Sequence, residues 1–497
     1  MSNQSSVAFV RRDILPPAPP PPGQAGVLLW IRENLFSSVT NTLLTIFSIY
    51  LIWSVLASIM PWTFNGIWSA GSLTECRGIR YARGLESAAC WAVINERWLQ
   101  LLFGFYPTDD RLLSSLFYAD QLSAAGGLEA VFGAGSNATA RIEFVSAMKA
   151  DLSNLTIFFF GYWRPLLAVL LLVVAIAPIL YASLPRSMLL LSLAYPFVGV
   201  FLFWGGSVWG PVTAALGLVG ALYVGRFVSG RYGLLGGALA AVMAFILFFL
   251  NPLGVVGYSG LFPLFPHVKG LLAAVLPMGL PAIPSDQFGG FMLAIIIGTA
   301  GIVLSLPIGI LLALGRQSTM PFIRWVCVAF IEVIRGVPLI VWLFVASTLL
   351  KYFLPPGSSF DALLRVITLV TLFSSAYIAE VVRGGLAALP KGQYEAADSL
   401  GLDYWKSMQL IVLPQALKIS IPGIVNTFIG LFKDTTLVVF VGLRDPLGLT
   451  NAIRATPEWN GIYWELYIFV ALLFFTFCFF MSRYSMYLER KLQTDRR

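Results

Sequence analysis

Apolar runs of roughly 20 residues recur in this 497-residue chain and constrain its fold more than any other feature. A helix needs about 20 such residues to cross the hydrocarbon core of a bilayer. Hydrophobic residue types make up 58% of the chain and charged types 11%, whereas a soluble domain carries about 25% charged residues. The sequence therefore predicts an all-α integral membrane protein, and excludes a soluble enzyme, a disordered chain and a disulfide scaffold.

The positions of the runs divide the chain into five parts. We expect a Pro-rich tail over 1–37, a first membrane helix over 38–60 that is too long for a signal peptide, and a polar insert over 61–165. Accessory helices and an outer loop then fill 166–284, and a last group of helices fills 285–497. The total is about ten membrane helices: 38–60, 166–183, 187–204, 211–226, 234–256, 288–314, 325–350, 362–383, 421–443 and 463–482.

Basic residues orient these helices. With the N-terminus inside, the inner segments carry 17 of the 32 Lys and Arg residues, and the short outer segments carry four. This asymmetry follows the positive-inside rule, from which loops as long as 61–165 are exempt. The sequence thus predicts that both termini are cytoplasmic and the insert periplasmic. The net charge of +8 needs no nucleic-acid partner, because topology accounts for the basic excess.

Histidine and cysteine are too sparse for the usual metal or nucleophile sites. The chain has one histidine, His267, and four cysteines, so we expect no metal site and no Ser-His-Asp triad. Cys327 and Cys478 lie in apolar helices and fill space. Cys76 and Cys90 share the polar insert, where they either form a disulfide in an oxidising compartment or remain two free thiols.

The longest inner loop, 384–420, contains two short helical segments. Tyr394 to Leu400 reads as a helix ended by Gly401, because glycine adopts the left-handed C-terminal conformation at little cost. A second helix over about 403–413 begins at Asp403, a side chain suited to an N-cap, and is expected to stop before Pro414. Small alanines on the first helix leave a smooth face that another molecule can approach closely.

The same loop resembles a known family pattern. Glu395-Ala396-Ala397, then Gly401, Ile411 and Leu413-Pro414, match the EAA loop of the membrane subunits of binding-protein-dependent ABC importers at every fixed position. Further stretches resemble permeases of the polar amino acid subfamily: Ile334-Arg335-Gly336-Val337-Pro338-Leu339, Ala376-Tyr377-Ile378-Ala379-Glu380, and Lys433-Asp434-Thr435-Thr436-Leu437. Within the insert, Asn95-Glu96-Arg97-Trp98 and Phe105-Tyr106-Pro107 resemble the extended permeases of general L-amino acid importers.

This resemblance implies a fold and a mechanism. Residues 285–497 would form the five-helix core of a type I ABC importer, and the EAA segment would be a coupling helix that docks on a cytoplasmic ATPase subunit. It assigns the coupling role to Glu395, Ala396, Ala397, Gly401, Leu413 and Pro414. A second permease subunit and a periplasmic amino acid binding protein complete the expected assembly. The insert would dock the binding protein, contact the partner permease or stabilise the assembly.

ATP must be bound elsewhere. The chain contains no G-x-x-x-x-G-K-[ST] sequence and no Gly-Lys dipeptide, so it cannot form a P-loop. We therefore expect this chain to bind no cofactor itself, and expect ATP and Mg²⁺ on the partner ATPase. The chain is then a transport subunit rather than an enzyme.

Ionisable and polar residues at membrane depth are the candidates for a substrate path. Such charges cost roughly 2.5–3.5 kcal/mol each to insert, so they pair or line a wet path. Glu332 and Arg335 stand three apart on one helix and can pair, as can Glu380 and Arg383. For Glu380 and Arg383, a structural ion pair is favoured over a substrate contact. For the others, ion pairing and amino acid binding both remain open. The candidate path residues are Glu332, Arg335, Ser374, Ser375, Asn426, Lys433, Asp434 and Thr435.

The combined prediction is the multi-pass permease subunit of an ATP-driven importer for L-amino acids in a bacterial inner membrane, surrounded by lipid. Two alternatives remain at this point. An ion-coupled secondary amino acid transporter would show inverted repeats with matching broken helices, and no such repeat is evident. A membrane recognition protein would instead use the insert to bind its target.

Overall fold

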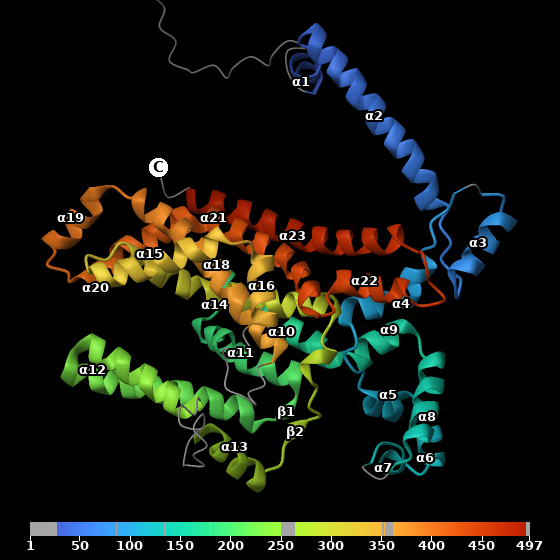
Figure 1. The fold of residues 1–497 in the computed structure, drawn as a ribbon, viewed down its shortest axis with the longest axis horizontal. Helices are drawn as coiled ribbons and strands as arrows, with labels where there is room; N and C mark the ends of the chain where they lie inside the picture. Colours follow the sequence, from blue (N-terminus) through green and yellow to red (C-terminus); the bar gives the residue numbers. More distant parts are fainter. Residues whose placement is uncertain are drawn as a thin grey trace, which may run out of the picture. The chain divides into compact units, whose positions relative to one another are not determined.

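The computed structural model describes residues 27–85, 87–133, 136–181, 183–249, 264–349, 352 and 361–493, which are almost entirely helical. The Pro-rich stretch 16–22 lies outside these residues. The chain divides into two compact units, Met1–Ala92 and Val93–Arg497. The predicted insert, 61–165, extends across the boundary between them. Figure 1 shows the helices coloured along the sequence.

The first unit is built around one membrane helix. It contains α1 (Val27–Asn34), α2 (Val39–Phe64) and α3 (Leu73–Ala82). The Ser38 side chain caps α2 by accepting a hydrogen bond from Asn41 N at 3.1 Å. No residue of α2 is buried within the protein, as expected of an apolar helix whose sides face lipid. A disulfide joins Cys76 of α3 to Cys90, with their Cα atoms 6.1 Å apart.

The polar stretch at the start of the second unit forms a series of short helices. These are α4 (Ala92–Phe103), α5 (Asp110–Phe117), α6 (Ala119–Ala124), α7 (Leu128–Phe132), α8 (Ala138–Asp151), α9 (Asn154–Thr156) and the π-helical η1 (Ile157–Gly161). Asp109 caps α5 through Leu112 N. The Phe103 ring stacks on the Tyr162 ring with centroids 4.1 Å apart. The Tyr106 hydroxyl donates to the Phe203 carbonyl at 2.9 Å and thereby fastens this segment to α11 (Leu189–Trp204). Burial raises the pKa of Tyr106 to about 12.

The accessory helices follow. They are α10 (Trp163–Leu180), the short 3-10 helix η2 (Arg186–Met188), α11, α12 (Trp209–Phe249) and α13 (Leu264–Val275). Helix α12 runs across two predicted spans, 211–226 and 234–256, and breaks at Gly233, whose φ of 74° suits glycine alone. Two short strands, β1 (Gly206–Ser207) and β2 (Gly279–Leu280), pair in antiparallel orientation and connect the start of α12 to the segment after α13.

The remaining helices form a bundle around α18 (Ala362–Ala387). Helix α14 (Gly290–Arg316) packs along α18, which packs in turn on α21 (Leu413–Asp434). Gly309 permits the first contact, because a Cβ there would lie 2.7 Å from Ile378 Cγ2. The other elements are η4 (Ser285–Gln287), α15 (Pro321–Gly336), α16 (Leu339–Thr348), α19 (Lys391–Ser399), α20 (Tyr404–Ser407), the π-helical η5 (Met408–Val412), the 3-10 helix η6 (Thr435–Val441), α22 (Pro446–Arg454) and α23 (Trp464–Gln493).

Seven helices of the described part are long and apolar enough to cross a membrane, or nine if each of two bent pairs counts as one span. The fifth predicted span, 234–256, corresponds in the described part to the shorter apolar helix Gly236–Phe245, and residues 250–256 are not described. The prediction of one helix over 325–350 is wrong, because α15 and α16 meet at 98°. Pro338 explains the break: it lacks an N–H, and Val337 before it is extended (φ −121°, ψ 134°).

Candidate functional site: the α19 loop and the charge cluster beside it

Helix α19 ends as the sequence predicts. Leu402 N donates to the Ala397 carbonyl at 3.3 Å, and Gly401 N to the Asp398 carbonyl at 2.9 Å. These two bonds form a Schellman motif, whose C′ residue needs a positive φ. Gly401 has φ +69° and faces open space. The helix begins three residues before the predicted start, at Lys391.

The EAA residues lie on two sides of α19. Glu395 and Ala396 are exposed, whereas Ala397 has no exposed surface and packs inward. Leu413 is half-buried and Pro414 is exposed. Several large apolar side chains around the loop are also exposed: Leu400, Tyr404, Trp405 and Leu410. The loop therefore presents a short helix with a small-residue position, flanked by uncovered apolar and aromatic groups.

The segment after α19 corrects one prediction. Asp403 caps α20 as expected, by accepting from Lys406 N at 3.0 Å. The helical backbone does not stop before Pro414, however. The π-helical turn η5 leads directly into α21, with Pro414 in its first turn. Proline is tolerated there because the first-turn N–H groups have no partner within an α-helix. The predicted ninth span at 421–443 therefore starts too late.

A side-chain hydrogen bond ties the two halves of the loop together. Gln415 Nε2, on α21, donates to Gln393 Oε1 on α19 at 2.8 Å and to the Ile411 carbonyl at 3.0 Å. Tyr394 of α19 packs against the buried cluster that contains Ile378, Val382 and Ala416, and burial raises its pKa. Helix α19 is thus anchored to both α18 and α21.

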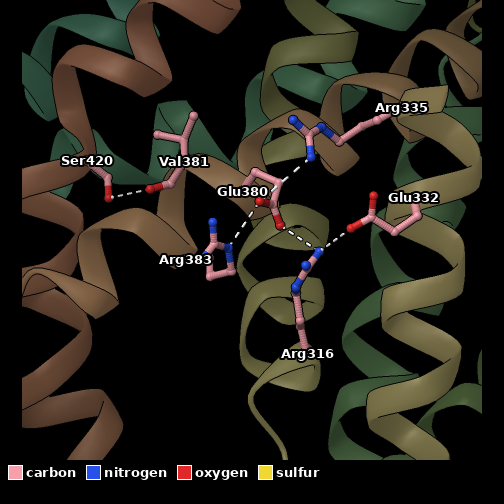
Figure 2. Close-up of polar contacts among 7 residues, drawn as sticks. All are labelled: Arg316, Glu332, Arg335, Glu380, Val381, Arg383 and Ser420. Carbon is pink, nitrogen blue, oxygen red and sulfur yellow. Dashed lines mark hydrogen bonds and ion pairs between the residues drawn. The ribbon is translucent and has the colours of Figure 1, made fainter.

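A cluster of five charged residues lies where α14, α15 and α18 meet (Figure 2). Its centre is Glu380, whose side chain is 15% exposed. Glu380 Oε1 lies 2.8 Å from Arg316 Nη1, and Glu380 Oε2 lies 3.7 Å from Arg335 Nη1 and 3.1 Å from Arg383 Nε. Glu332 joins at the edge, with Oε1 2.9 Å from Arg316 Nη1. We call these five residues the Glu380 cluster.

The cluster confirms one predicted pair and corrects another. Glu380 and Arg383 pair at the i,i+3 spacing, as expected. Glu332 pairs with Arg316 instead of its own helix neighbour Arg335, which reaches across to Glu380 and stands over the Tyr377 ring at 5.3 Å. Arg316 is the functional candidate that the sequence did not reveal, because it was counted among the inner-loop residues that set topology. No local sequence signal pointed to it, because its partners Glu332 and Glu380 lie on other helices.

Close packing of α18 on α21 continues the site towards α19. Ser420 Oγ donates to the Val381 carbonyl at 3.2 Å, as Figure 2 shows. Gly385 is buried at this crossing, and a Cβ there would lie 2.5 Å from the Ala416 carbonyl oxygen and would overlap Ser420 Oγ. The two helices therefore approach within backbone contact just before the α19 loop.

The other predicted path residues lie on α18, α21 and η6 without forming one polar site. Ser375 Oγ donates to the Thr371 carbonyl and Thr435 Oγ1 to the Phe432 carbonyl, so both buried hydroxyls bond to their own local backbone. Ser374 is buried as well. Asn426 and Lys433 are exposed, and Asp434 is half-buried. A role for these residues in amino acid binding stays a prediction.

Comparison with known proteins identifies the family. A family model described as "binding-protein-dependent transport system inner membrane component" matches residues 305–494. The glutamate/glutamine/aspartate/asparagine transport system permease protein BztC of Rhodobacter capsulatus is 48% identical over 505 residues, which cover 99% of this chain and all of that protein. The chain belongs to the amino-acid ABC transporter permeases. The inner membrane amino-acid ABC transporter permease YhdY of Escherichia coli is also 36% identical, over 97% of both proteins.

This membership confirms the family expected from the EAA spacing. The permease is a multi-pass inner membrane protein and a transport component, not an enzyme, and its family works with ABC ATPase subunits. A solved structure titled "Crystal structure of an amino acid ABC transporter with histidines" is 30% identical and covers 40% of this permease and 90% of that chain, with a TM-score of 0.36. Among the described residues, no three His, Cys, Asp or Glu side chains are grouped to hold a metal ion.

Proposed function

We propose that this permease couples amino acid import to ATP hydrolysis through α19, which docks on a separate ATPase subunit that holds ATP and Mg²⁺. The observation that supports this most is the uncovered α19 loop. Glu395 and Ala396 face outward, and Leu400, Trp405 and Leu410 are more than half exposed beside them, at 71%, 51% and 64%. Uncovered apolar groups next to a small-residue position suit a protein partner.

The anchoring of α19 supports transmission of a partner's movement. Three residues separate α18 from α19, and the Gln393–Gln415 hydrogen bond links α19 to α21. Glu380 lies seven residues before the end of α18, about 10 Å along the helix axis. Through the Glu380 cluster, the end of α18 is held to α14 and α15. A displacement of α19 would therefore shift several membrane helices together.

We propose that the cargo consists of L-amino acids and includes the acidic amino acids and their amides. This specificity rests on the 48% identity, over the whole chain, to a permease named for glutamate, glutamine, aspartate and asparagine. A periplasmic binding protein would deliver the amino acid, and a second permease subunit would supply the other half of the pathway. By the distribution of basic residues, both termini would lie in the cytoplasm.

Docking on the ATPase is tested by site-directed cross-linking in membranes that contain the complete transporter. The variant Ala396→Cys should cross-link to the ATPase subunit, in a background where Cys327 and Cys478 are replaced by alanine. Thr319→Cys is the matched control, because it is exposed on the short link between α14 and α15 rather than on α19. Cross-links at both positions, or at neither, would contradict the docking of α19.

Cargo is tested by uptake of labelled L-glutamate into proteoliposomes that hold the transporter, its binding protein and ATP. Unlabelled glutamine, aspartate and asparagine should compete with the labelled glutamate. Competition only by basic or apolar amino acids would contradict the proposed specificity, and the absence of ATP-driven uptake of any amino acid would contradict the proposed function itself.

A further inference from the structure

A polar cavity lies at the end of the helix bundle away from α19. Its volume is about 650 Å³, and its lining includes Phe105, Asp286, Gln287, Asp361 and Arg444. Helix α14 begins beside it at Gly290 and ends at Arg316 in the Glu380 cluster, 27 residues or about 40 Å away. Helix α18 also starts at this cavity, and η6 ends there. The cavity therefore opens at the opposite membrane face from the coupling helix.

The cavity wall is built from three chain segments paired through their backbones. Gly104 forms an antiparallel bridge with Phe288, and Gly289 a parallel bridge with Arg444. Gly290 N donates to the Arg444 carbonyl at 2.8 Å. Gly104 has φ +67°, and a Cβ there would overlap the Gly289 backbone. The segment around Phe105, from the predicted insert, is thus fixed against the transport core at this site.

The charged side chains of the cavity differ in whether they already have hydrogen-bond or ion-pair partners within the protein. Asp361 accepts from Leu363 N at 2.9 Å, from Leu364 N at 3.1 Å and from Ser285 Oγ, so it serves as the N-cap of α18. The exposed Asp286 and Arg444 take part in no ion pair found among the described residues. Arg444 instead stands over the Phe105 ring at 4.5 Å, an arrangement that orients its guanidinium group. One carboxylate and one guanidinium remain available for a ligand.

We propose that this cavity binds the zwitterion of the transported L-amino acid before it enters the membrane path. Arg444 would bind the α-carboxylate, for which a planar guanidinium is suited, and Asp286 the α-ammonium group. The volume lies within the range of small-molecule sites. Since the free charges bind the groups common to all amino acids, this site would recognise the class, and side-chain selection would occur elsewhere. The proposal rests on the proposed function, because it assigns a site to the same cargo.

The test is equilibrium binding of radiolabelled L-glutamine to the complete permease–ATPase complex in nanodiscs, without ATP and without the binding protein. Unlabelled L-glutamine and L-asparagine should compete. N-acetyl-L-glutamine, whose amine is blocked, and the α-amide of L-glutamine, whose carboxylate is blocked, should not. Arg444→Gln and Asp286→Asn should each weaken binding roughly 10- to 100-fold, as expected for the loss of a charge-assisted hydrogen bond.

Two kinds of control keep the result interpretable. Arg444→Lys preserves the charge but not the planar guanidinium, and should bind more weakly than wild type but more tightly than Arg444→Gln, which separates loss of the charge from misfolding. Arg324→Gln and Asp120→Asn remove exposed charges elsewhere and should bind as wild type does. Binding unchanged in Arg444→Gln and Asp286→Asn, competition by the blocked derivatives, or no wild-type binding up to millimolar ligand would each overturn the site. If ATP-driven uptake with the binding protein persists in that case, only this inference fails and the proposed function stands.

Discussion

Arg316 Nη1, in the last residue of α14, lies 2.8 Å from Glu380 Oε1 in α18 and links two helices that are far apart in the sequence. Glu380 also meets Arg335 and Arg383, so one carboxylate opposes three guanidinium groups. These contacts hold together the ends of α14, α15 and α18, close to the loop that carries the EAA motif.

Replacing Glu380 should destabilise the permease, because Glu380→Gln leaves three positive charges facing one another without their shared carboxylate. We expect the free energy of unfolding to fall by about 2–3 kcal/mol, measured by SDS-induced unfolding in detergent. Glu332→Gln is the matched control: it removes one ion pair of a side chain that is 55% exposed, and should cost about 0–1 kcal/mol. Equal losses in the two variants would contradict the central position of Glu380.

The adjacent glycines Gly384 and Gly385 should respond oppositely to alanine. At Gly385 the new methyl group meets Ser420 Oγ and the Ala416 carbonyl of α21, so Gly385→Ala should cost about 1–3 kcal/mol of stability. At Gly384 a Cβ meets nothing within 4 Å, and alanine should stabilise the helix by up to about 1 kcal/mol. Thermal unfolding of both variants in the same detergent measures the difference. A harmless Gly385→Ala would show that α18 and α21 are not in backbone contact.

The disulfide between Cys76 and Cys90 should protect both thiols from alkylation in the native permease. Both residues are nearly buried, at 3% and 4% exposure, and close a short loop. Mass spectrometry after maleimide treatment should detect labelling at these positions only when a reductant is present. Because a loop of this length is worth about 3 kcal/mol in the chain-entropy model, Cys76→Ser should also sensitise the region to proteolysis. Labelling of both cysteines without reductant would contradict the bond.

Asp445 should make stability depend on pH. It caps α22 through Leu447 N and Gly448 N and has no exposed surface, and burial raises its pKa to about 6. The Asp445 carboxyl group therefore stays protonated to a higher pH in the folded state than in the unfolded state. Stability contributed by Asp445 is complete at low pH and is lost as the pH rises from about 4 to 6, by up to about 3 kcal/mol.

The variant Asp445→Asn isolates this effect, since asparagine keeps an acceptor for the cap and carries no charge. Melting temperatures of the two proteins, measured at several pH values between 4 and 7.5, should diverge in favour of Asp445→Asn as the pH rises. A constant difference across that range would mean that Asp445 titrates with its ordinary pKa.

Local signals in the sequence were sufficient for most of the membrane helices and for the end of α19. Apolar runs predicted the helices, Gly401 predicted the left-handed turn, and Asp403 predicted the next N-cap. Each of these features depends on residues only a few positions apart. The same reasoning missed the π-helical turn η5, which lets the chain continue through Pro414 into α21. It also treated 325–350 as one helix despite Pro338.

Tertiary contacts explain the remaining differences. The i,i+3 spacing made Glu332 and Arg335 look like partners, but helix packing brings Arg316 to Glu332 and Glu380 to Arg335. Nothing in the sequence near Glu332 or Glu380 could show that Arg316, on another helix, would approach both carboxylates. The cavity beside Asp286 and Arg444 likewise joins residues more than 150 positions apart, around backbone bridges that leave no periodic pattern.

The central claim is that α19 transmits ATP hydrolysis to the membrane helices, and the ratio of amino acid uptake to ATP hydrolysis in proteoliposomes tests it most directly. Gly401→Pro removes the turn that ends α19, while Gly461→Pro alters a glycine that also has positive φ and open surroundings, outside the loop. We predict that Gly401→Pro lowers the ratio about tenfold or more, a coupling loss of about 1.4 kcal/mol, and that Gly461→Pro leaves it unchanged. A wild-type ratio in Gly401→Pro would contradict the account.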